Sequence, residues 1–113
     1  MLAWKSLQKQ ADAVQRQADK LDAEADKYWD KAEQLEDKAE QLRQKADEVQ
    51  GARRNEMLVK AEALVKQAEA LRVQAQQLEA QAAELEIQAE GLQGRADEVE
   101  NQIEELQESE GEH

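Results

Sequence analysis

The chain has 113 residues, of which 27 are acidic and 15 are basic, so its formal net charge is −12. This balance disfavours direct binding to nucleic acid or to anionic membrane surfaces, because both depend on Lys and Arg. Cysteine is absent, which excludes disulfides, thiolate zinc sites and thiol catalysis. Proline is absent too and aromatic residues amount to 3%, so the composition indicates long helices rather than a compact globule.

The N-terminal segment MLAWKSLQKQADAV contains no apolar run long enough for a signal peptide. No stretch of the chain reaches the roughly 20 apolar residues of a transmembrane helix. We therefore expect a soluble, cytoplasmic protein without a membrane span. The helical pattern already begins in this segment, and we expect a single helical coiled-coil domain over residues 1–113.

The first predicted element is a helix over about residues 2–50. Within it, alanine recurs at every seventh position, and a larger apolar residue follows three positions later. This spacing is typical of the seam of a left-handed coiled coil. The seam residues of the first helix are Ala11, Ala18, Ala25, Ala32, Ala39, Ala46, Leu21, Leu35 and Leu42.

Two adjacent rings, Tyr28 and Trp29, interrupt the run of Ala and Leu in the middle of this helix. Tyr28 occupies a seam position, and Trp29 falls beside it. We interpret Trp29 either as a residue that packs on the flank of a larger bundle or as an anchor for a separate partner. Trp is enriched at interface hot spots, which keeps the second interpretation open.

The heptads are interrupted in the segment QGARRNE. We expect a turn at about residues 51–55, with Gly51 as a helix stop and Asn55 as an N-cap. Arg53 and Arg54 would lie in this turn, either solvated or in contact with an acidic partner. The alternative is one continuous helix that passes through a skip residue and pairs in parallel with another chain.

The second predicted helix spans about residues 56–108, and an acidic, frayed C-terminus follows at 109–113. Reversal of the chain would bring the alanines of both arms together, which resembles the close-packed antiparallel arrangement called an Alacoil. We therefore predict an all-α fold, a long antiparallel two-helix coiled-coil hairpin with Ala/Leu heptads. The seam residues of the second helix are Ala61, Ala68, Ala75, Ala82, Ala89, Ala96, Leu64, Leu71, Leu78, Leu85 and Leu92.

The second helix also carries apolar residues outside the seam. We expect them to form a second interface, through which hairpins associate into a four-helix bundle or a larger helical assembly. The alternative is that they are scattered surface residues, which are common. The predicted interface consists of Trp29, Leu58, Val65, Val73, Ala80 and Ile87.

No group of residues with catalytic or metal-binding spacing stands out. The one histidine is His113, and the serines are limited to Ser6 and Ser109, neither of which has a plausible base partner. Glu-x-x-His and EF-hand patterns are absent, and we interpret the acidic clusters near the C-terminus as a solvated face. We therefore expect no enzymatic activity, no metal and no cofactor.

These patterns favour a structural or assembly protein, a self-associating helical hairpin that acts as a scaffold or as a subunit of a bundle or filament. A homo-oligomer is the expected state. One alternative is an adaptor module that binds a helix of another protein. Another is a de novo designed coiled-coil protein without a natural function, which the regular heptads would suit.

Overall fold

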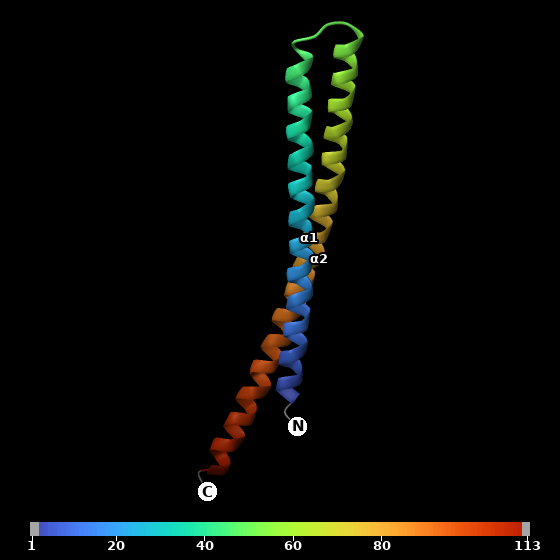
Figure 1. Cartoon of the computed structure of the whole chain (residues 1–113). Coiled ribbons are helices and arrows are strands. Elements are labelled where there is room, and N and C mark those ends of the chain that lie inside the picture. Colours follow the sequence, from blue (N-terminus) through green and yellow to red (C-terminus); the bar gives the residue numbers. More distant parts are fainter. Residues whose placement is uncertain (1–2, 112–113) are drawn as a thin grey trace. The chain divides into compact units, whose positions relative to one another are not determined.

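The computed structural model describes residues 3–111, and within this range the chain forms two long helices and no strand (Figure 1). Helix α1 spans Ala3–Ala46 and helix α2 spans Ala52–Gly111. The predicted all-α class and the helical hairpin are thereby confirmed. The first residue of the predicted helix 1, residue 2, and the last two of the predicted C-terminal tail, 112–113, lie outside the described residues.

The turn between the helices lies earlier in the chain than the sequence pattern predicts. The N–H groups of Glu48 and Val49 donate to carbonyls three residues back, at 3.1 and 3.3 Å, which closes the last turn of α1 tightly. Gly51 then adopts a φ of 77°, a left-handed conformation that glycine reaches without strain. Its carbonyl accepts the N–H of Asn55 at 3.3 Å, the first helical bond of α2.

Gly51 is therefore the N-cap of α2 rather than the stop of α1, and Asn55 is not the N-cap. Glycine is an acceptable N-cap, because only its backbone carbonyl is needed for the first helical bond. As a consequence, Arg53 and Arg54 lie in the first turn of α2 and not in the connecting turn. Asp47 and Glu48, which were predicted to be helical, lie in the connection. The heptad pattern did not predict this, because it cannot distinguish the last helical turn from the turn that follows it.

The first of two compact units, here called the turn unit, consists of residues 22–79. It contains the C-terminal half of α1, the connection and the first half of α2, which lie side by side (Figure 1). Two contacts join its helices, from Trp29 to Glu79 and from Arg72 to Glu36. The turn unit is thus an antiparallel helical hairpin in its own right.

The second compact unit, here called the terminal unit, pairs residues 3–21 of α1 with residues 80–111 of α2. Gln8 and Gln93, from the two helices, exchange hydrogen bonds in it. Helices α1 and α2 each contribute residues to both units. The expectation of one helical domain stays a prediction.

Alanine alone makes up the buried apolar core of the described residues. Over residues 11–46 of α1 and 61–96 of α2, every seventh residue is an alanine with at most 5% of its surface exposed. No larger side chain among the described residues is fully buried. The buried residues are Ala11, Ala18, Ala25, Ala32, Ala39, Ala46, Ala61, Ala68, Ala75, Ala82, Ala89 and Ala96.

Within the range 3–111, neither helix contains a segment long and apolar enough to cross a membrane.

Candidate interaction surfaces

The leucines that accompany the alanines lie at the margin of the buried core. Each follows an alanine by three residues, which places it on the same side of its helix. All eight are half-buried: Leu21, Leu35, Leu42, Leu64, Leu71, Leu78, Leu85 and Leu92. The leucines therefore keep part of their apolar surface in contact with solvent.

One flank of the turn unit, here called the Trp29 flank, carries polar contacts between the helices. The indole N–H of Trp29 donates to the carboxylate of Glu79. Seven residues further along α1, Glu36 forms an ion pair with Arg72, which lies seven residues before Glu79. The same helical position thus faces its equivalent across the antiparallel pair, in two successive heptads.

Two of the residues predicted to form an interface, Leu58 and Val65, also belong to the Trp29 flank. They precede Arg72 at intervals of seven residues, so they share its position on α2. Val65 is half-buried and Leu58 has 36% of its surface exposed. They extend the edge of the hairpin core and do not project from its outer side.

The other predicted interface residues of α2 point away from α1. Val73, Ala80 and Ile87 each follow a buried alanine by five residues, a spacing that places them on nearly the opposite side of the helix. Val73, in the turn unit, has 51% of its surface exposed, and Ile87, in the terminal unit, has 68% exposed. The six predicted residues therefore occupy two kinds of surface, a flank and an outer face.

Sequence reasoning missed one residue of this outer face. Val59 has 65% of its surface exposed and precedes Val73 by two heptads, in the turn unit. The sequence contained the information, because Val59, Val73 and Ala80 belong to one series of residues at seven-residue intervals. It was missed because Lys66 interrupts the series between Val59 and Val73.

The opposite flank of the turn unit, here called the Lys38 flank, is basic. Lys38 and Lys45 of α1 line a shallow groove with Leu42 and with Leu64 of α2. Lys31, one heptad before Lys38, has its ammonium nitrogen 6.0 Å from the centre of the Tyr28 ring. The sequence pattern did not predict this basic flank, because its lysines are interspersed with acidic residues along the chain.

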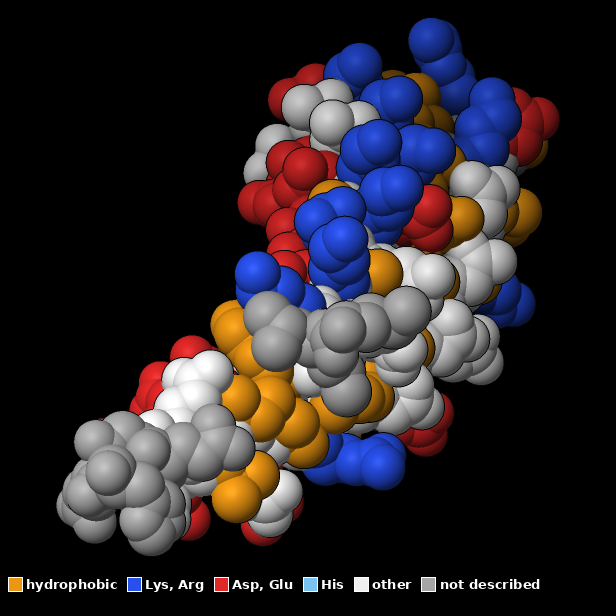
Figure 2. Space-filling model, turned by 90° about the horizontal axis from the view of Figure 1, so that it is seen from below, with side chains coloured by type: hydrophobic (Ala, Val, Ile, Leu, Met, Phe, Trp, Pro, Cys, Tyr) orange, Lys and Arg blue, Asp and Glu red, His pale blue; other side chains and the backbone are white. Residues whose placement is uncertain are grey.

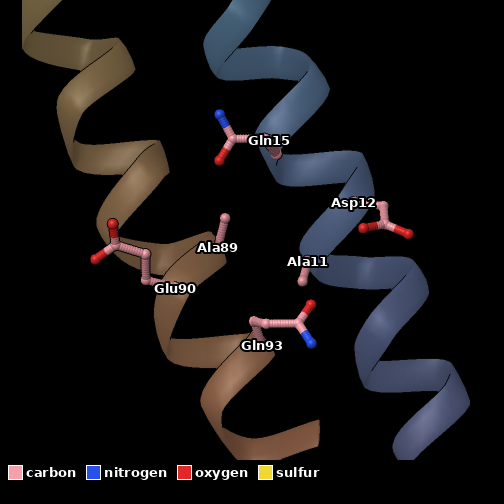
Figure 3. Close-up of a pocket in the computed structure, with 6 residues that line it drawn as sticks. All are labelled: Ala11, Asp12, Gln15, Ala89, Glu90 and Gln93. Atoms are coloured by element: carbon pink, nitrogen blue, oxygen red, sulfur yellow. The ribbon is translucent and has the colours of Figure 1, made fainter. Parts of the chain in front are cut away.

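The terminal unit has a groove of its own between α1 and α2 (Figure 3). Ala11 and Ala89 lie at its base, and the amides of Gln15 and Gln93 extend into the space between the helices. The carboxylates of Asp12 and Glu90 point away from this space. The groove thus presents small apolar and neutral amide groups rather than converging charges.

Comparison with known proteins gives no match. No protein-family model, curated protein or solved structure is similar to the chain. Among the described residues, no three or more His, Asp or Glu side chains are grouped so that they could hold a metal ion. A proposal for function therefore depends on the surfaces of the two helices.

Proposed function

We propose that the protein is a structural or assembly protein, a helical hairpin that associates with further copies of itself and serves as a scaffold or as a subunit of a bundle or filament. The supporting observation is that the buried core of the described residues consists of alanine alone. Burial of apolar surface is the main favourable contribution to folding, at about 0.8 kcal/mol per buried methylene-sized group. An alanine core supplies one such group per position.

In this proposal, the two arms pair as a coiled coil of the Alacoil type. Small side chains at every seventh residue of both helices permit a close approach of the backbones. The half-buried leucines then remain available for contacts with a further helix, as they would in a four-helix bundle. A second layer of helices would cover the apolar area that a two-helix pair leaves exposed.

The outer face of α2 supplies the surface for this association. Val59, Val73 and Ile87 are large apolar side chains that are more than half exposed. The corresponding positions of α1 hold Lys9, Arg16, Ala23, Asp30, Asp37 and Gln44. This contrast favours the outer face of α2, and not that of α1, as an associating surface.

Sedimentation equilibrium over a range of micromolar concentrations tests the proposal. We expect a mass at least twice that of the 12.8 kDa chain. A V73Q/I87Q variant should associate more weakly, because glutamine retains helix propensity but removes the apolar contact. An A23Q variant, at an exposed position of α1, is the matched control. A wild-type monomer at every concentration would exclude the proposal.

The adaptor interpretation differs in what covers this surface. It requires Trp29, Val73 and Ile87 to grip a helix of another protein, yet Trp29 belongs to a flank and Val73 to the outer face. One helix lying on α2 would reach Val73 without Trp29. Self-association is therefore the function that these positions favour.

A further inference from the structure

The two flanks of the turn unit differ in charge. On the Trp29 flank, α1 presents the heptad position of Trp29 and the position four residues after it. Both positions recur at seven-residue intervals. From residue 22 onward within α1, these positions hold five acids and one base: Asp22, Asp26, Glu33, Glu36, Glu40 and Arg43. The Trp29 flank of the hairpin is therefore negative along α1.

The Lys38 flank has the opposite sign. On this side, α1 presents the heptad position of Lys38 and the position four residues before it. Over the same range these two positions hold four lysines and a single acid: Glu24, Lys27, Lys31, Lys38 and Lys45. All four lysines are exposed. Figure 2 shows Lys and Arg side chains gathered in a strip, with a group of Asp and Glu side chains on its left.

The second helix does not neutralise either flank. On the Trp29 flank, α2 adds Glu62, Glu69 and Glu79 against Arg72 alone. On the Lys38 flank, the same two positions of α2 hold Arg53 and Lys60 against Glu56 alone, and their other residues are uncharged. Because equivalent positions face each other in this hairpin, the lysines have neutral or basic residues opposite them.

The ion pairs within the described residues agree with this separation. Both lie on the Trp29 flank, between Arg43 and Glu40 and between Arg72 and Glu36. Neither involves a lysine of the Lys38 flank. In an antiparallel pair, charges at the flanking positions ordinarily match across the seam and set the choice of partner. Here, apart from Arg72 with Glu36, most acidic and basic residues of α1 lie on opposite flanks of the same hairpin.

We propose that the turn unit docks side by side with a second copy of this chain, with the Lys38 flank of one copy on the Trp29 flank of the next. The inference rests on the proposed self-association through the outer face of α2, and it adds a second, lateral contact between copies. An interface between two different surfaces of the same chain is heterologous, so each copy retains a free flank after pairing. The association therefore continues beyond a dimer, into a ring or a filament.

Two charge-reversal variants test this geometry. K31E/K38E/K45E makes both flanks acidic along α1, and D26K/E33K/E40K makes both flanks basic along α1. All six residues are exposed, so the substitutions leave the alanine core in place, and circular dichroism checks that each variant remains helical. D30K/D37K, on the outer face of α1, is the control for a change in net charge.

Sedimentation velocity gives the readout. We expect the wild type to form species larger than a dimer at about 50 mM salt, and its association constant to fall at least tenfold at about 500 mM, where exposed charges are screened. Each reversal variant alone should lose these species, because like flanks repel. An equimolar mixture of the two should regain them, since every flank again meets its opposite.

Several results would overturn the geometry. Association of both reversal variants as strongly as the wild type would exclude the flanks as the interface and leave the proposed function intact. Failure of the mixture to associate, or equal loss of association in D30K/D37K, would also exclude it. A monomeric wild type at every salt concentration would remove both the geometry and the proposed function.

Discussion

The side-chain amides of Gln8 and Gln93, which are 85 residues apart in sequence, donate to each other's carbonyl oxygens in two hydrogen bonds of 2.6 Å. Both residues are half-buried at the edge of the alanine core of the terminal unit. The Gln93 amide also donates to Asp97 at 2.9 Å. The pair joins α1 to α2 at the edge of the seam, where the alanines alone offer no polar contact.

This pair should contribute to the stability of the terminal unit. We expect Q8A or Q93A alone to lower the free energy of unfolding by about 1 kcal/mol, because each leaves one partly buried amide without its partner. The double variant should cost less than the sum of the two, with a coupling of about 0.5–1.5 kcal/mol. Urea denaturation at a fixed protein concentration measures all three.

The control for this cycle is Q10A, since Gln10 is exposed on the same helix. It should change the stability by no more than a few tenths of a kcal/mol. Additive effects of Q8A and Q93A would show that the two amides act independently, which would contradict a contribution of their pairing to stability.

The close approach of the helices at the alanines gives a second prediction. Ala25 is fully buried in the turn unit, while Ala23, two residues away on the same helix, is exposed. A25L should lower the stability by about 1–3 kcal/mol, because added methylenes in a packed core force the surrounding groups apart. A23L should be nearly neutral, since Leu and Ala have similar helix propensity.

Thermal unfolding followed by circular dichroism distinguishes these two variants. Equal midpoints for A25L and A23L would mean that the helices are far enough apart at Ala25 to accept a leucine. That result would also contradict the proposed Alacoil type of packing, which needs a small side chain at this position.

The sequence specified the two helices well, for a clear physical reason. Alanine at every seventh residue is a periodic signal repeated many times, so a single irregular residue such as Tyr28, at a position that mostly holds leucine, does not obscure it. The chain reversal was also predictable, because Gly51 lies where the heptads break. Local propensity and long-range pattern agree in these parts of the chain.

The ends of the helices and the charged flanks were harder to predict. The residues around Ala46 and Glu48 give no sharp signal for the end of a helix, so the local sequence did not predict the residue at which α1 ends. The charge separation depends on which side of the seam each residue occupies. Lys38 and Glu40 are two residues apart in the chain but belong to opposite flanks, so a linear count of charges conceals it.

The backbone of Gly51 gives a third prediction. Its φ of 77° lies in the left-handed region, where a side chain with a Cβ is disfavoured. Space is not the obstacle, since no heavy atom lies within 4 Å of a Cβ built at this position. G51A should therefore lower the stability by about 1–2 kcal/mol through backbone strain alone, measured by urea denaturation. G51N should recover part of the loss, because Asn adopts this conformation more readily than Ala.

The glycines inside α2 should respond in the opposite direction to the same substitution. Gly91 and Gly94 lie in the interior of the helix, and a Cβ at either position would meet no heavy atom within 4 Å. Alanine exceeds glycine in helix propensity by about 1 kcal/mol, so G91A and G94A should each raise the free energy of unfolding by about that amount. The comparison with G51A is direct, since all three positions have room for the methyl group and only Gly51 has a positive φ. A loss of stability in G91A or G94A would mean that a neighbouring chain occupies the space beside that glycine, and sedimentation of the same variant would then show weaker association.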